Sequence, residues 1–167
     1  MKTKKIVTYG ILIAVALVLS YLESLIPPFF AVPGMKLGLT NLVVLIALYL
    51  MGTGSALLIN ILRVLLVGLL FGNLISLLYS VAGALLSWIV MLLLKRTGKF
   101  SIVTVSIAGG VFHNIGQILV AMLILRTVSI AWYLLALWVS GIVAGAVIGI
   151  IGGLLCKRLK GIFAKGI

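Results

Sequence analysis

Apolar residues occupy six long runs of the chain, and short polar, glycine-rich or proline-containing segments separate these runs. The runs predict helices at about 5–26, 37–51, 56–71, 74–94, 101–125 and 129–155. Most of them approach or exceed the ~20 residues that an α-helix needs to cross the hydrocarbon core of a bilayer. The pattern therefore predicts an all-α membrane protein with six transmembrane helices, in which residues 1–167 form a single integral membrane domain.

Residues 27–41 interrupt this pattern of long helices. The segment contains all three prolines of the chain, and proline ends helices because it lacks an N–H group and clashes with the preceding turn. The apolar run that follows, 37–51, is short for a full crossing. The second helix therefore either begins within 34–38 or is a broken half-helix, whose first turn favours anions. We expect the segment to form a lid over a binding site.

Composition and charge agree with the membrane class. The chain is 65% hydrophobic and 8% charged, with a mean hydropathy of +1.47, whereas soluble domains carry about 25% charged residues. The net charge of +12 does not indicate nucleic acid, because ten of the thirteen cations lie within 2–5, 95–99 and 157–165, between or beyond apolar runs. This positive-inside pattern predicts cytosolic termini in a multi-pass protein of a prokaryotic plasma membrane, in contact with its lipid.

Polar side chains inside the apolar runs are the candidate site. An arginine near the middle of a span costs at least ~2.5–3.5 kcal/mol on insertion scales, so Arg63 must face protein, water or ligand. Two other polar groups accompany Arg63: one is His113, Asn114 and Gln117, and the other is Glu23 with Lys36 and Asn41. Together the three groups predict an outward-facing cavity with more positive than negative charge, suited to a small anionic or amphipathic molecule. The candidate substrate-binding residues are Lys36, Asn41, Asn60, Arg63, His113, Asn114 and Gln117.

Each of these residues also has a structural interpretation, which the sequence leaves open. Arg63 pairs with Glu23, the only carboxylate residue, in one interpretation. His113 makes an interhelical hydrogen bond in another, and Lys36 is then an ordinary interfacial lysine. Glycine recurs every fourth residue within 141–153, and this stripe predicts close helix packing, either inside the chain or against a partner.

Catalysis fits the composition poorly. A metal-bound diphosphate site generally needs several acidic ligands, and the chain contains one glutamate, no aspartate and one histidine. A phosphate-binding loop of the Gly-x-x-x-x-Gly-Lys type is also missing from the sequence. We therefore expect no enzymatic activity, no metal and no cofactor in this chain, and any ATP hydrolysis on partner chains.

Three sequence blocks in order carry a resemblance to a known family. They are Pro33–Asn41, then Leu62–Leu66 with Gly68–Gly72, and finally His113–Gln117. With the six-helix pattern, the chain resembles the Gx transporter family, also labelled heptaprenyl diphosphate synthase component I. That family is similar to the substrate-binding S-components of energy-coupling factor (ECF) transporters, which are six-helix proteins with a lid between the first two helices.

The resemblance implies a function and partners. An S-component docks on a shared transmembrane subunit and two ATPases through small residues of its first helix. In this chain the corresponding positions are Gly10, Ala14, Ala16 and Ser20. The alternative is a non-catalytic membrane subunit associated with heptaprenyl diphosphate or menaquinone synthesis, whose partner is a soluble prenyl diphosphate synthase. A membrane component of an electron-transfer or flavin-related assembly is a third hypothesis that the sequence neither supports nor excludes.

Overall fold

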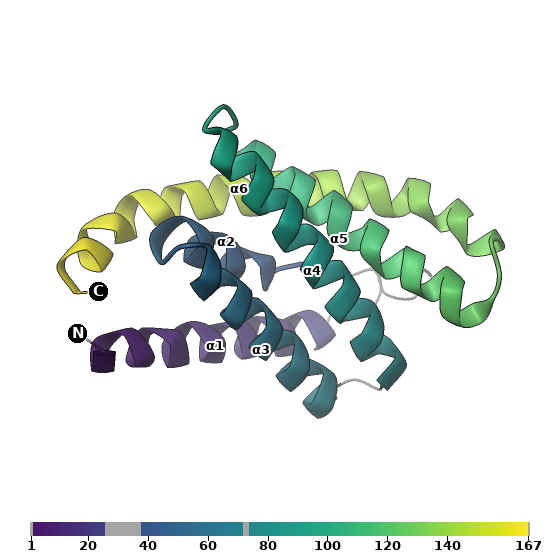
Figure 1. The fold of residues 1–167 in the computed structure, drawn as a ribbon, viewed down its shortest axis with the longest axis horizontal. Coiled ribbons are helices and arrows are strands. Elements are labelled where there is room, and N and C mark those ends of the chain that lie inside the picture. The colour runs from purple at the N-terminus through teal and green to yellow at the C-terminus, as the bar shows by residue number, and fades with distance from the viewer. Residues whose placement is uncertain (1, 26–37, 72–73, 167) are drawn as a thin grey trace.

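The computed structural model describes residues 2–25, 38–71 and 74–166, and this part of the chain is all-helical, as predicted (Figure 1). The start of the first helix and the end of the last lie at the same end of the molecule. The elements are α1 (Lys2–Leu25), α2 (Asn41–Leu50), α3 (Thr53–Phe71), α4 (Leu74–Thr97), α5 (Ile102–Leu125), a 3-10 turn η1 (Ser129–Trp132) and α6 (Tyr133–Gly166).

The helices differ in whether they are long enough to cross a membrane. Five of the described helices have the length and hydropathy for a crossing, whereas α2 has only ten residues. At 1.5 Å per residue it extends about 15 Å, half of the ~30 Å hydrocarbon core. The prediction of six crossing helices is therefore wrong for α2. The broken half-helix that the sequence left open is what the structure contains, and it begins after Gly38, whose φ of +74° suits glycine.

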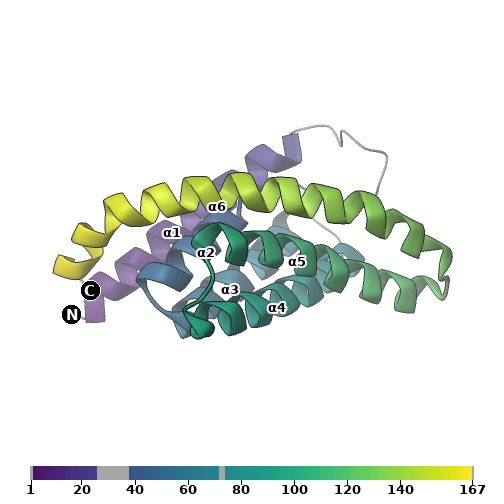
Figure 2. The same ribbon diagram turned by 90° about the horizontal axis from the view of Figure 1, so that it is seen from above.

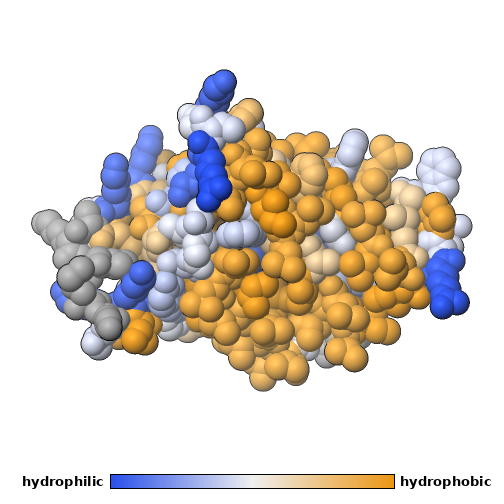
Figure 3. Space-filling model, viewed as in Figure 1, coloured by the Kyte–Doolittle hydropathy of each residue, from blue (hydrophilic) through white to orange (hydrophobic). Residues whose placement is uncertain are grey.

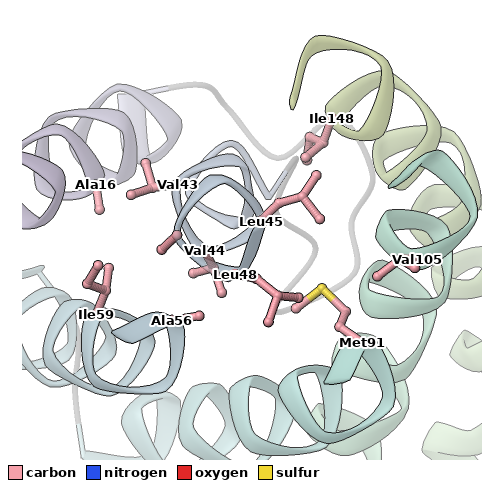
Figure 4. Close-up of a cluster of buried hydrophobic side chains, with 11 residues drawn as sticks. Ala16, Val43, Val44, Leu45, Leu48, Ala56, Ile59, Met91, Val105 and Ile148 are labelled. Atoms are coloured by element: carbon pink, nitrogen blue, oxygen red, sulfur yellow. The ribbon is translucent and has the colours of Figure 1, made fainter. Parts of the chain in front are cut away.

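The half-helix α2 lies at the centre of the bundle. Residues 43–48 are all buried, so this helix is enclosed on every side rather than on one face. Figure 4 shows its side chains surrounded by α1, α3, α4, α5 and α6. The surrounding contacts are Ala16, Ala56, Ile59, Met91, Val105 and Ile148. Residues 43–48 have no polar side-chain atoms, so this part of the helix can be buried without leaving a side-chain polar group unpaired.

Glycines set the distance between α5 and α6. A Cβ atom on Gly145 would lie 2.6 Å from Cα of Ile107, and one on Gly149 would lie 2.7 Å from Cα of Val103. One on Gly110 of α5 would lie 2.6 Å from the carbonyl oxygen of Gly141. The predicted packing role of the glycine stripe is therefore confirmed, and the packing is internal to the chain over residues 141–149.

The surface of the bundle is suited to lipid. Figure 3 shows one face that is hydrophobic across its middle, with hydrophilic residues gathered towards the ends. Large apolar side chains are exposed on all five long helices, for example Leu123 and Leu135. Figure 2 shows α6 running along the whole length of the molecule. These features are compatible with a multi-pass membrane protein.

The close contact between α5 and α6 makes a specific prediction for Gly145. We expect Gly145→Ala to lower the free energy of unfolding by about 1–3 kcal/mol, because the new methyl group meets backbone atoms that cannot rotate away. The measurement is the thermal unfolding midpoint of the detergent-purified protein. Gly161→Ala is the matched control on the same helix, since nothing lies within 4 Å of a Cβ there. Equal midpoints for the two variants would contradict the packing argument.

Candidate functional site

A polar cavity lies inside the bundle beside the start of α2. Its volume is about 120 Å³, and because one water needs about 10–15 Å³ of such space, it has room for a small molecule or several waters. Residues of α1, α3, α4, α5 and α6 line it, together with the turn that precedes α2. The polar lining side chains are Ser20, Glu23, Thr40, Asn41, Arg63, Ser76, Ser80, Ser106, His113, Asn114, Gln117 and Ser140.

Arg63 is the centre of a hydrogen-bond network on one wall of the cavity. Its side chain is only 7% exposed. The guanidinium donates through Nη2 to Oδ1 of Asn41 at 2.8 Å and through Nη1 to the hydroxyl of Thr40. Through Nε it donates to Oδ1 of Asn60 at 3.1 Å. Arg63 therefore ties α3 to the first residues of α2, and it lines the cavity as predicted.

Asn60 has a different role from the predicted one. Its Nδ2 donates to the backbone oxygen of Ala84 at 3.0 Å, while its Oδ1 accepts from Arg63. The side chain is 2% exposed and is not among the described residues that line the cavity. The prediction of a ligand contact is therefore corrected. Asn60 joins α3 to α4 by a hydrogen bond and orients the guanidinium of Arg63.

Glu23 balances the charge of Arg63. Its buried carboxylate accepts a hydrogen bond from the backbone N–H of Gly38 and is close enough to Arg63 to interact with it electrostatically. The described cavity wall thus carries one carboxylate and one guanidinium. The predicted excess of positive charge depends on Lys36 and stays a prediction. The remaining predicted cation, Lys36, lies outside the described residues.

Three predicted residues of α5 also line the cavity. His113, Asn114 and Gln117 share one face of the helix. Asn114 also has a structural bond, because its Nδ2 donates to the backbone oxygen of Leu137 at 2.7 Å and so joins α5 to α6. Glycine at residue 83 of α4 allows α5 to pack closely here: a Cβ there would lie 2.6 Å from the backbone oxygen of His113 and 2.9 Å from Cγ of Gln117.

Five serines complete the lining, and the sequence interpretation did not select them as site residues. They are Ser20, Ser76, Ser80, Ser106 and Ser140. One of them, Ser140, donates to the backbone oxygen of Leu137 at 3.1 Å. Isolated serines in apolar helices are common, so they gave little signal, although Ser76 and Ser80 are four residues apart and share a face. The polar part of the lining therefore consists mainly of neutral hydrogen-bonding groups.

Comparison with protein families now adds to this geometry. The family model described as heptaprenyl diphosphate synthase component I matches residues 12–155. The chain belongs to this family. The match extends from α1 into α6 and includes every described residue of the cavity. Comparisons with curated proteins and with solved structures give no match.

The family description names a synthase, and the residues of the cavity bear on that chemistry. Among the described residues, no group of three histidine, cysteine, aspartate or glutamate side chains is placed to hold a metal ion. Glu23 is the only carboxylate side chain in the sequence. The cavity thus presents hydrogen-bonding groups, one carboxylate and one guanidinium, which are groups that bind and orient a molecule.

The four predicted docking residues of α1 do not share a surface. Gly10 and Ala14 are exposed, and nothing lies within 4 Å of a Cβ on Gly10. Ala16 and Ser20 are 0% and 8% exposed, because they face α2 and the cavity. The predicted docking surface is therefore corrected for Ala16 and Ser20, which a partner cannot reach in this arrangement, and only Gly10 and Ala14 remain candidates.

Because Glu23 and Arg63 interact electrostatically, substitutions of the two residues should have non-additive effects on the free energy of unfolding. Glu23→Gln or Arg63→Met alone leaves one buried charge without its partner, whereas the double variant removes both charges. We expect the double variant to be more stable than the sum of the single effects by about 0.5–3 kcal/mol. Thermal or chemical unfolding of the four proteins in one detergent measures this coupling. Additive effects would show that the two charges are independent.

Proposed function

We propose that this chain is a substrate-binding membrane subunit, similar to the S-components of ECF-type transporters, for a small anionic or amphipathic molecule. The observation that carries the proposal is the polar cavity of about 120 Å³ in the interior of an apolar bundle. Polar side chains inside a membrane are costly and mark substrate pathways when they line a cavity. Twelve polar side chains line this one cavity, and they come from the five long helices, the turn before α2 and the first residue of α2.

The lining favours a ligand with both a polar and an apolar part. Within the described part of the chain, Arg63 donates hydrogen bonds to Thr40, Asn41 and Asn60. Its guanidinium also lines the cavity, where it suits an anionic or carbonyl oxygen of the ligand. Val64, Val67 and Ile148 supply an apolar wall for the rest of the molecule. Because Glu23 balances Arg63, the ligand carries at most a small negative charge.

The start of α2 supports the lid proposal. Gly38, Thr40 and Asn41 line the cavity and directly follow the proline-containing segment. A broken helix that lines a binding site at membrane depth is a recurrent design of transport proteins. The lid over residues 27–37 and the ligand role of Lys36 remain proposals on residues outside those described. In this function the termini are cytosolic, and partner chains hydrolyse ATP.

A second function is supported by the family description. Component I of heptaprenyl diphosphate synthase would be a non-catalytic membrane subunit, and its partner would be a soluble prenyl diphosphate synthase. The single carboxylate of the chain places any metal-dependent diphosphate chemistry on that partner. The two functions differ in which soluble protein accompanies the chain.

Ligand retention tests the cavity. We expect native mass spectrometry of the wild-type protein, purified in mild detergent from expressing cells, to show a bound small molecule. Gln117→Leu and Ser80→Ala should each weaken the affinity roughly twofold to tenfold and so lower the bound fraction, since a lost hydrogen bond costs about 0.5–1.5 kcal/mol. Arg63→Ala should lower it further. Both milder variants leave the Arg63 network intact, so they report on binding rather than on folding.

The control for this experiment is Thr104→Val, a polar-to-apolar change at an exposed position of the same helix α5. It should retain the molecule like the wild type. If Gln117→Leu, Ser80→Ala and Arg63→Ala all retain as much of it as Thr104→Val does, the cavity is not the binding site.

Co-purification tests the partner. We expect an affinity-tagged chain to recover an ATPase module from native membranes, and Ala14→Leu to reduce that recovery about tenfold by blocking close helix approach. Ala14 is exposed on α1, so the change leaves the internal packing intact. Val18→Leu, which is exposed on the same helix, is the control. Recovery of a soluble prenyl diphosphate synthase instead of an ATPase would establish the second function and contradict the first.

A further inference from the structure

The last helix extends beyond the helix it packs on. Helices α2 and α6 run in the same direction: a Cβ on Gly38 would lie 3.7 Å from Cδ1 of Ile148, and one on Gly152 would lie 2.7 Å from Cδ2 of Leu45. Helix α2 then ends at Leu50. Helix α6 continues to residue 166, for a total of 34 residues or about 51 Å, which exceeds the ~30 Å hydrocarbon core.

A groove lies where α6 passes the end of α2. Its volume is about 400 Å³, and its lining residues are Tyr49, Leu50, Ile102, Gly153, Cys156, Lys157, Lys160 and Phe163. On α6, Gly153, Lys157 and Lys160 are spaced four and three apart, and Phe163 follows three residues later, so they share one face of the helix with Cys156 beside them. The two lysines are exposed, whereas Leu50, Ile102 and Phe163 are half-buried. The groove thus combines an apolar floor with two cations at its edge.

The charges around the groove favour an anion. Lys95 of α4 donates through Nζ to the backbone oxygen of Leu48, and it lies 5.1 Å from the centre of the Tyr49 ring. This cation offsets the negative C-terminal end of α2, which would otherwise repel an anion. The only carboxylate side chain of the chain, that of Glu23, lines the separate cavity at the other end of α2.

We propose that this groove binds one anionic phospholipid, with the phosphate between Lys157 and Lys160 and an acyl chain along Leu50, Ile102 and Phe163. Basic pockets between helices at the cytoplasmic side of a membrane recognise anionic headgroups in this way. The groove shares no described lining residue with the cavity, so the inference does not depend on the proposed ligand or transport function.

Filling the groove tests the proposal without removing any charge. Nothing lies within 4 Å of a Cβ on Gly153, so Gly153→Leu should fold normally while its side chain enters the groove. Gly161→Leu is the matched control, because it has equally open space on the same helix and does not line the groove. Native mass spectrometry of delipidated protein, titrated with phosphatidylglycerol or phosphatidylcholine, measures binding.

We expect the wild type and Gly161→Leu to bind phosphatidylglycerol more tightly than phosphatidylcholine, and Gly153→Leu to lose at least fivefold in affinity for phosphatidylglycerol. Replacing Lys157 and Lys160 by alanine should weaken the affinity for phosphatidylglycerol about 25-fold, at roughly fivefold per cation. Replacing Lys4 and Lys5 instead, which removes the same charge from the start of α1, should have less than a fivefold effect.

Three outcomes would overturn the proposal. One is equal binding by Gly153→Leu and Gly161→Leu, which would place the lipid elsewhere. Another is equal weakening by the two double-lysine variants, which would reduce the effect to net charge. The third is displacement of bound phosphatidylglycerol by millimolar inorganic phosphate, which would show that the groove binds a free anion and that the acyl chain contributes nothing.

Discussion

The buried guanidinium of Arg63 is the interaction on which the arrangement of this bundle depends. A charge inside a membrane protein must be paired and hydrogen-bonded, and here its partners come from two other places in the chain. Thr40 and Asn41 bring the first residues of α2, and Glu23 brings the end of α1 through Gly38. Asn60 extends the network to α4. Removing one partner from such a buried network generally costs about 3–5 kcal/mol.

This network also explains how a half-helix is stable in the middle of the molecule. Irregular backbone at membrane depth requires partners for its polar groups. The carboxylate of Glu23 satisfies the N–H of Gly38, and the carbonyl oxygen of Gly38 accepts the N–H of Asn41 at 2.8 Å. The rest of α2 is apolar and buried on all sides. The groups that stabilise the break are therefore the same groups that form the polar wall of the cavity.

Close packing of α4, α5 and α6 forms the other walls of the cavity. Glycines at 110, 141, 145 and 149 bring α5 and α6 into backbone contact, and glycines at 83 and 116 do the same for α4 and α5. Residues of all three helices line the cavity, among them His113, Asn114 and Gln117 of α5. The groove at the end of α6 arises differently, because α2 is short and leaves a longer neighbour partly uncovered. The length of α2 thus accounts for the groove.

The sequence by itself determined the helical class, most helix boundaries, the break before α2 and the residues that are too polar for lipid. Hydropathy and proline act locally, so each of these follows from a few neighbouring residues. Only the tertiary structure decided which way each helix faces. Ala16 and Ser20 face inward, Asn60 faces α4 rather than the cavity, and isolated serines of four helices meet around one space. Core-facing and lipid-facing surfaces in this chain are both apolar, so the pattern along a helix carries little information about its orientation.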